Sequence, residues 1–243
     1  MNENRFILRL HIALLVIVLL GFARSFYLRD LFLSRPLDSA LRIHGALLTS
    51  WFALTVLQSY LIARGRRHSH RQVAWIAGLV ALGVVLSSAW INTRLATTLR
   101  SAAEPENIFV WGNYLTLVAF IALFVAGIRS RRDPQGHRRL ILLASIAITG
   151  PAFARFAFWP VIGYGVGVAP IFSIAGLVAL LALVVGYDLL NLRKVHSATA
   201  KGLAAIVICI ALGVGIGASG LGFQVLSWFG LTVLPNAASS LLP

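Results

Sequence analysis

Residues 42–71 of the chain read RIHGALLTSWFALTVLQSYLIARGRRHSHR. Most of this stretch is one apolar run, and a helix of about 20 apolar residues, at 1.5 Å per residue, crosses the ~30 Å hydrocarbon core of a bilayer. The run ends in a cluster of arginines, which is typical of the cytoplasmic end of a membrane span. The stretch therefore predicts a transmembrane helix followed by a short basic turn.

Three side chains interrupt this run at intervals of seven residues: His44, Trp51 and Gln58. On a straight helix this spacing drifts by only ~20° per repeat, so the three side chains share one face. Because a polar group facing lipid is costly, we expect this face to point into a bundle of helices. Packing that locks helices together explains the same pattern, so the three residues alone do not define a binding site.

The composition of the whole chain is that of a membrane protein. Hydrophobic residues make up 59% of the 243 residues and charged residues 12%, with a mean hydropathy of +0.87, whereas soluble proteins have about 45–50% apolar and about 25% charged residues. Seven runs are long enough to span a bilayer, and no segment remains for a soluble domain. The runs are residues 6–26, 40–63, 72–93, 108–128, 138–159, 168–190 and 202–222.

Each run is expected to be a helix, because the runs are continuous and lack the period-two alternation of barrel strands. The predicted fold class is an all-α integral membrane protein, a bundle of seven transmembrane helices in which residues 1–243 form a single domain. The first run has an alternative interpretation, since Arg5 and Arg9 before an apolar core resemble a signal peptide with Ala23 at its cleavage position. The apolar character continues through Phe26 and Tyr27, which favours an uncleaved helix.

Lysine and arginine are distributed unevenly between the two sides of the predicted bundle. Fourteen lie on the side of the N-terminus, six lie on the opposite side, and Arg155 lies within the fifth run. Because basic loops stay in the cytoplasm, we expect the N-terminus inside and the C-terminus outside. The short loops and the lack of an organelle signal favour a bacterial cytoplasmic (inner) membrane, with a eukaryotic membrane as the alternative. The net charge of +14 then reflects topology and attraction to anionic lipid headgroups. Nucleic-acid binding would need a folded polar face, which the chain lacks.

Histidines precede three runs on the predicted cytoplasmic side. His70 and His137 each stand before an arginine at the start of the third and fifth runs, and His196 stands before the seventh. Neutral imidazole is a common ligand of metal ions and haem. These three residues and Asp188 therefore predict a haem-binding or divalent-metal-binding module of the redox type. In the alternative interpretation, the histidines meet only water or headgroups.

Asp188 lies at the end of the sixth run, and every other acid belongs to a terminus or a loop. A carboxylate in this position has two roles open to it. It can accept the N–H group of a ligating imidazole, or it can pair with Arg138 or Arg139 at the start of the fifth run.

A second functional hypothesis uses the outer half of the bundle. His44, Trp51, Asn113 and Arg155 are predicted to lie in this half, and Arg155 belongs to the segment GPAFARFAFWP of residues 150–160. Two of these side chains carry amide or guanidinium donors, so the set predicts a pocket that accepts an anion. The corresponding function is a small-molecule or lipid transporter.

No catalytic signature is present. Lys194 and Lys201 both lie at a boundary, so no lysine is placed for a retinal Schiff base, and His68 and His70 point to different sides of a helix, unlike the histidine clusters of membrane di-iron enzymes. No acid lies near the midplane, where proton-coupled carriers use one. The single cysteine, Cys209, is expected to be a small core residue. Neither a substrate nor an oligomeric state follows from the sequence.

Several short motifs occur together in a characteristic order. They are IHG (residues 43–45) with Trp51 and Gln58, HR (70–71), DPQGHRRLILLA (133–144), GPAFAR (150–155) and YDLLNLRKVHSA (187–198). In this order the chain resembles an uncharacterised group of bacterial seven-span integral membrane proteins, over residues 42–197.

The group carries the patterns Ile-His-Gly, His-Arg-Xaa-Leu-Gly, His-Lys-Arg-Leu-Met and Tyr-Asp-Leu followed by Val-His-Pro. This chain departs from the patterns at residues 72–75 and at Arg42, Ile141 and Ser197, where the group often has histidine, methionine and proline, respectively. The departure at Arg42 weakens any site that needs two outer histidines. The resemblance implies the seven-span architecture and the candidate positions, and it implies no activity.

Overall fold

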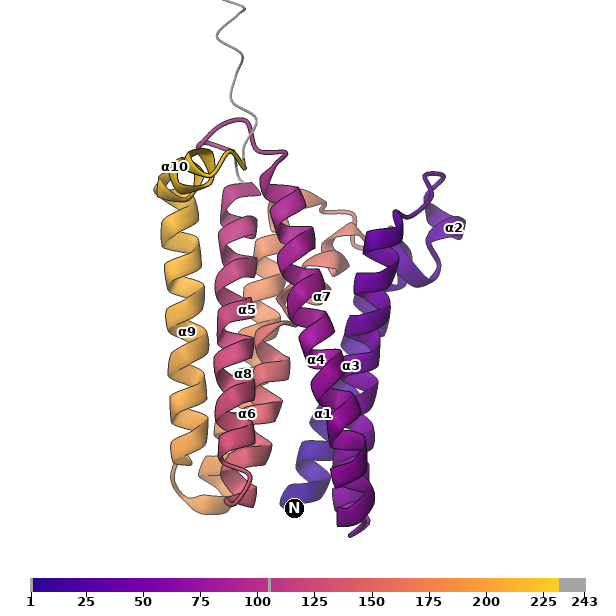
Figure 1. The fold of residues 1–243 in the computed structure, drawn as a ribbon, viewed down its shortest axis with the longest axis vertical. Helices are drawn as coiled ribbons and strands as arrows, with labels where there is room; N and C mark the ends of the chain where they lie inside the picture. Colours follow the sequence, from indigo (N-terminus) through magenta and orange to yellow (C-terminus); the bar gives the residue numbers. More distant parts are fainter. Residues whose placement is uncertain (1, 105, 232–243) are drawn as a thin grey trace, which may run out of the picture.

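The computed structural model describes residues 2–104 and 106–231. Within these residues the chain is helical and contains no strand. Seven helical segments among them are long and apolar enough to cross a membrane (Figure 1). The predicted all-α fold with seven helices of spanning length is therefore confirmed, while insertion and orientation in a bilayer stay predictions.

Two of the seven spans are composite. The first joins α1 (Glu3–Phe22) to a π-helix, η1 (Ala23–Tyr27), and the fifth joins α6 (Pro134–Ala147), α7 (Gly150–Ala154) and a 3-10 helix, η2 (Arg155–Phe158). The other spans are α3 (Ser39–Ala63), α4 (Arg67–Ala96), α5 (Glu106–Arg129), α8 (Ala169–Leu192) and α9 (Ser197–Ala218). The short elements are α2 (Arg29–Phe32), η3 (Val166–Val168) and α10 (Leu221–Trp228).

Polar caps explain why several spans begin before their apolar runs. The pattern predicts starts at residues 138 and 202, whereas α6 begins at Pro134 and α9 at Ser197. Asp133 Oδ1 accepts the backbone N–H of Gln135 at 3.1 Å, and His196 Nδ1 accepts that of Ala198 at 3.1 Å. Such caps satisfy backbone N–H groups of the first helical turn. The first turn is therefore helical although its polar residues do not belong to the apolar run.

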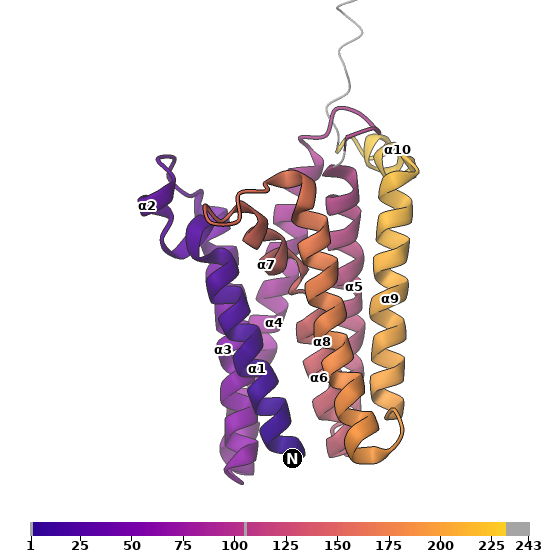
Figure 2. The ribbon, with the colours of Figure 1, turned by 180° about the vertical axis from the view of Figure 1, so that it is seen from behind.

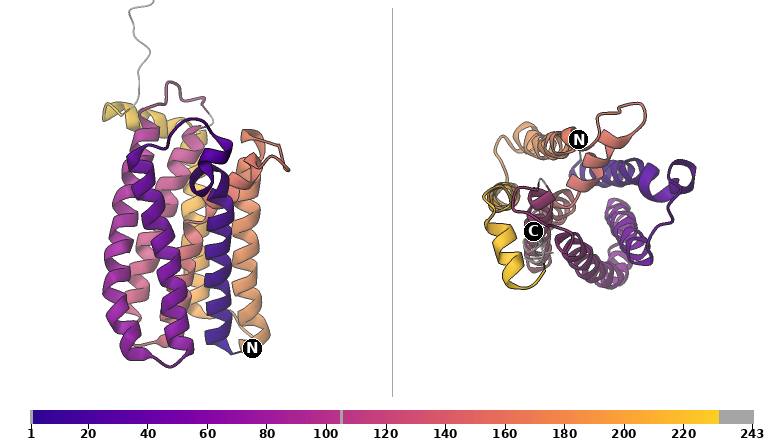
Figure 3. Two further views of the ribbon diagram at one scale, coloured as in Figure 1. Left: turned by 90° about the vertical axis from the view of Figure 1, so that its right-hand side faces the viewer. Right: turned by 90° about the horizontal axis from the view of Figure 1, so that it is seen from above.

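The spans alternate in direction and form one bundle. Figures 1 and 2 show α1, α3 and α4 together on one flank, and α5, α6, α8 and α9 on the other. In the view from above, the helices surround a central region that the fifth span enters (Figure 3). We refer to the end of the bundle that holds Glu3 as the N-terminal side, and to the opposite end as the far side.

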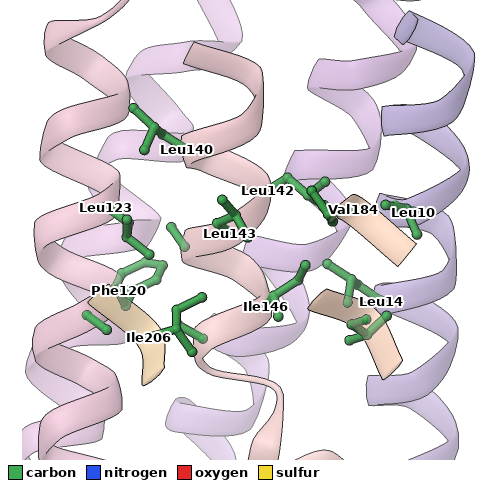
Figure 4. Close-up of a cluster of buried hydrophobic side chains, with 14 of the residues drawn as sticks. Leu10, Leu14, Phe120, Leu123, Leu140, Leu142, Leu143, Ile146, Val184 and Ile206 are labelled. Atoms are coloured by element: carbon green, nitrogen blue, oxygen red, sulfur yellow. The ribbon is translucent and has the colours of Figure 1, made fainter. Parts of the chain in front are cut away.

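The fifth span organises the core. It packs against α1, α5, α8 and α9. In its most apolar 18-residue segment, 67% is buried, which is more than in any other span of the described residues. Leu142, Leu143 and Ile146 of α6 belong to one buried cluster with side chains of α1, α5, α8 and α9. Figure 4 shows Leu14 of α1 and Phe120 of α5 among them. The central helix therefore holds the two flanks together.

In contrast, α4 exposes an apolar stripe on its outer face. Trp75, Leu79, Leu82, Leu86 and Trp90 recur at intervals of three or four residues, and each is more than half exposed. This spacing places them on one face of the helix. A tryptophan at each end of such a stripe matches the aromatic belts of membrane proteins, so the stripe suits contact with lipid.

Two spans depart from regular α-helix at the far side. Pro151 has no N–H group and its ring clashes with the preceding turn, so α6 ends at Ala147 and the chain continues as α7 and then η2. In the first span, the π-helix η1 follows α1 directly. π-helical turns occur frequently at functional sites. These two irregular segments provide part of the wall of the cavity described next.

Candidate functional site

A cavity of about 320 Å³ lies in the far half of the bundle. Eight elements from across the chain contribute to its wall: α1, η1, α2, α3, α4, α5, α7 and η2. The volume is at the lower end of the range of about 300–1,000 Å³ that is usual for small-molecule sites. We call this the far-side cavity.

Apolar and polar side chains line different parts of its wall. The apolar part includes Phe22, Phe26, Leu48, Phe52 and Ile148. The polar part is formed by side chains that are neutral or cationic: Ser25, Arg29, His44, Thr49, Ser88, Asn92, Asn113, Thr116, Arg155 and the hydroxyl group of Tyr27. No carboxylate occurs among the described residues that line the cavity.

Arg155 provides a cationic group with spare hydrogen-bonding capacity. Its Nε is buried without a hydrogen-bond partner among the described residues, and its Cζ lies 4.7 Å from the centroid of the Phe22 ring. A cation over an aromatic face is stabilised, but the ring accepts no directed hydrogen bond from Nε. The guanidinium is therefore positioned by α7 and η2 but not fully satisfied by the protein.

A second, smaller cavity of about 240 Å³ adjoins the first. It is lined by Arg24, Ser25 and Arg155 together with Gly21, Leu33 and Phe158, so Ser25 and Arg155 face both cavities. Arg24 Nη1 donates to the carbonyl of Phe158 at 2.6 Å. Its Nε and the hydroxyl of Ser25 are buried without partners in the described structure. Three residues with unsatisfied polar groups thus line the smaller cavity, and two of them, Ser25 and Arg155, also line the first.

The amide and imidazole groups of the wall are positioned by neighbouring helices. His44 Nδ1 lies 3.0 Å from the Ser87 hydroxyl. Asn92 Nδ2 donates to the carbonyl of Val110 at 2.9 Å, and Asn113 Nδ2 donates to Asn92 Oδ1 at 3.4 Å. These bonds connect α3 to α4 and α4 to α5, so the polar wall is a fixed part of the bundle.

The structure brings together three of the four residues predicted for the outer pocket. His44, Asn113 and Arg155 all line the far-side cavity. Trp51 does not line it; its side chain is 1% exposed and packs edge-to-face on Phe120 and Phe124, at centroid distances of 5.3 and 5.6 Å. Trp51 is therefore a core residue between the two ends of the bundle.

The four residues predicted for a cofactor site form two separate pairs. His70 and His137 lie side by side, with ring centroids 6.4 Å apart. His196 caps α9 and donates its backbone N–H to Asp188 at 3.0 Å, and Asp188 pairs with Arg139. Asp188 was expected either to accept the N–H group of a ligating imidazole or to pair with Arg138 or Arg139. In the structure it pairs with Arg139. The described residues contain no group of three or more His, Cys, Asp or Glu that could hold a metal ion, and binding of a cofactor stays a prediction.

Sequence reasoning missed several residues of these sites. Arg24 and Ser25 stand at the end of an apolar run and look like an ordinary boundary, because the π-helix that turns them inward leaves no simple pattern. Asn92 had a visible signal, since a buried amide in an apolar run needs a partner. His11 lines neither cavity, but it gives the same signal of a buried polar residue in an apolar run: it is 2% exposed, and its Nδ1 lies 2.9 Å from the Ser59 hydroxyl.

Comparisons with known proteins add no assignment, since no family model, curated protein or solved structure matches the chain.

Proposed function

We propose that this chain is a multi-pass protein of the bacterial cytoplasmic membrane that binds a small amphipathic anion in the far-side cavity, as a carrier of small molecules or lipids. With the N-terminus in the cytoplasm, the cavity lies in the outer half of the bilayer. The ligand class is an organic carboxylate or phosphate with an alkyl chain.

The observation that carries this proposal is the state of Arg155. Its buried Nε has no partner, and the lining of both cavities supplies no carboxylate to neutralise it. An unpaired guanidinium within a membrane is costly. A carboxylate or phosphate offsets this cost by accepting charge-assisted, bidentate hydrogen bonds from the planar guanidinium.

The remaining wall fits the rest of such a molecule. Apolar side chains, among them Phe22, Phe26 and Phe52, provide a surface for an alkyl chain. Ser25 and Arg24 add free donors on the side of the smaller cavity. Sites of this kind, mostly apolar with a few convergent polar groups, are typical of small-molecule binding.

A ligand-induced rise in thermal stability tests the proposal. Octanoate and octyl phosphate should raise the unfolding midpoint of the detergent-purified protein, because a ligand that binds only the folded state stabilises it. Octanol, which has the same alkyl chain without a charge, should give no comparable rise. Arg155→Gln should abolish the effect of both anions, whereas Arg100→Gln, at an exposed position outside the cavity, should retain it. Equal effects of octanol and octanoate would refute the anion site.

The haem-binding or metal-binding function predicted from the N-terminal-side histidines is a second candidate. One observation favours part of it, namely the proximity of His70 to His137. His196 is engaged as the cap of α9, so a ligand set that includes its Nδ1 would have to break this cap.

A further inference from the structure

The N-terminal side of the bundle holds a pair of imidazoles that the far-side cavity does not involve. His70 lies in the first turn of α4 and His137 in the first turn of α6. Their ring centroids are 6.4 Å apart, and the ring planes are perpendicular. The two rings thus meet across the boundary between the two flanks seen in Figure 1.

The proton of His137 is positioned by a backbone carbonyl. His137 Nδ1 lies 2.8 Å from the carbonyl oxygen of Gly127 on α5. A carbonyl only accepts, so Nδ1 carries the proton, and in the neutral ring Nε2 holds the free electron pair. A hydrogen bond of this kind to one nitrogen is how proteins usually orient a histidine whose other nitrogen binds a metal.

His70 has the complementary arrangement. Its ring lies near the backbone of Gln58 on α3, and its Nδ1 is buried without a partner among the described residues. In the neutral tautomer that carries its proton on Nε2, Nδ1 holds the free electron pair. Each ring can thus offer one nitrogen as an electron-pair donor, and the His137 ring is oriented by its bond to Gly127.

The side chain of Gln58 adds a further unsatisfied group. Both atoms of its carboxamide are buried, and neither has a partner in the described structure. Buried polar groups are normally paired. The orphaned carboxamide belongs to the residue whose backbone lies near the His70 ring, so it and the orphaned imidazole nitrogen need an explanation such as a bound ion. An amide oxygen is a competent oxygen ligand beside imidazole nitrogens.

We propose that His70 Nδ1 and His137 Nε2 together bind one transition-metal ion of the class that prefers imidazole, such as Zn²⁺ or Cu²⁺, with the carboxamide of Gln58 or water completing its coordination. Two nitrogens that each lie about 2.1 Å from one ion are at most about 4.2 Å apart. Rings with centroids 6.4 Å apart satisfy this limit when the two free nitrogens turn toward one another. The imidazole ligands favour these metals over Mg²⁺ or Ca²⁺, which prefer oxygen.

Equilibrium dialysis of the detergent-purified protein against Zn²⁺, followed by metal analysis, tests this site. The wild-type chain should retain about one ion, and His70→Gln and His137→Gln should each weaken binding by at least about tenfold, because each removes a ligand. The matched control is His68→Gln, since His68 is exposed on the same turn of α4. It should bind Zn²⁺ like the wild type.

Two further measurements separate loss of the site from loss of the fold. His70→Cys, which keeps a metal ligand at the position, should restore Zn²⁺ binding relative to His70→Gln. With Cu²⁺, electron paramagnetic resonance should show coupling to two imidazole nitrogens, which falls to one in His137→Gln. Retention of no Zn²⁺ by the wild type, or equal retention by wild type, His70→Gln and His137→Gln, would overturn the proposal. Either result leaves the far-side anion site unaffected, because none of these histidines lines it.

Discussion

The guanidinium of Arg139 on α6 donates two hydrogen bonds to Oδ1 of Asp188 on α8, from Nε at 3.1 Å and from Nη2 at 2.7 Å. The other carboxylate oxygen accepts the hydroxyl of Thr199 at 2.5 Å and the backbone N–H of His196 at 3.0 Å. Arg139 also pairs with Glu3 of α1. This ion network therefore joins α1, α6, α8 and α9 at the N-terminal side.

Asp188→Asn should destabilise the protein strongly. The side chains of Asp188 and Arg139 are 0% and 2% exposed. The substitution removes the carboxylate charge that accepts two hydrogen bonds from Arg139 and leaves this guanidinium with Glu3. Breaking a buried pair by removing one partner costs about 3–5 kcal/mol in soluble proteins. The unfolding midpoint in detergent should fall clearly. The double variant Arg139→Met/Asp188→Leu should be less destabilised than Asp188→Asn, since it removes the buried guanidinium together with its carboxylate partner while Glu3 keeps its pair with Arg138. If the double variant is as unstable as the single one, the charge is not the cause.

The exposed pair of Arg94 with Asp38 provides a control for that experiment. The hydrogen bond from Arg94 holds the pKa of Asp38 below its ordinary value. Both side chains are therefore charged at neutral pH, and the ion pair is lost only as the pH falls through that lowered pKa and Asp38 is protonated. Because solvent screens exposed pairs, Asp38→Asn should change the unfolding midpoint little at neutral pH. If Asp38→Asn lowers the unfolding midpoint as much as Asp188→Asn does, burial of the ion pair does not determine how much it stabilises the protein.

The spans were predictable from the sequence, whereas the way in which polar residues meet was not. The hydropathy of the sequence gives the length of each apolar run, and a helix of that length crosses the hydrocarbon core of a bilayer. It does not report which helices are neighbours, so His70, His137 and His196 share a depth but only the first two meet. Glu3 looked like part of a terminus, and only the packing of α1 against α6 brings it to Arg139.

The far-side cavity was predictable only in part, for a related reason. His44, Asn113 and Arg155 can be recognised in the sequence as polar residues in apolar runs. In a membrane protein such side chains face the interior of the bundle, where they find polar partners. Arg24 and Ser25 reach the same region because η1 is a π-helix. An extra residue within a turn rotates all later side chains, and no composition rule reveals this.

Gly217→Val on α9 should destabilise the contact with α5. An added Cβ at Gly217 would lie 2.6 Å from Ile108 Cα and 2.9 Å from the carbonyl oxygen of Asn107, which are backbone atoms that cannot turn aside. Overpacking of this kind costs about 1–3 kcal/mol, so the unfolding midpoint should fall. Gly215→Val is the matched control on the same helix, because nothing lies within 4 Å of its added Cβ. Equal midpoints for the two variants would contradict the close contact of these helices.

His44→Leu should weaken binding of octanoate in the far-side cavity while the fold is kept. The imidazole lines the cavity and contacts the Ser87 hydroxyl. After the substitution, this hydroxyl still donates to the carbonyl of Val84 at 3.3 Å, so no buried donor is orphaned. We expect affinity to fall by about tenfold, which is the loss of one hydrogen bond of about 1.4 kcal/mol. Titration followed by tryptophan fluorescence measures this change, and unchanged affinity would remove His44 from the site.

Orientation in the membrane can be tested with reporter fusions at two positions. The turn that joins α5 to α6 carries Arg129, Arg131 and Arg132 and lies on the N-terminal side, whereas α9 ends at Ala218 on the far side. Because basic turns stay in the cytoplasm, alkaline phosphatase inserted after Arg132 should be inactive, and the same enzyme fused after the last residue should be active outside. Activity of the Arg132 fusion together with inactivity of the C-terminal fusion would invert the topology. The far-side cavity would then open toward the cytoplasm, and its anion would have to come from the inner leaflet.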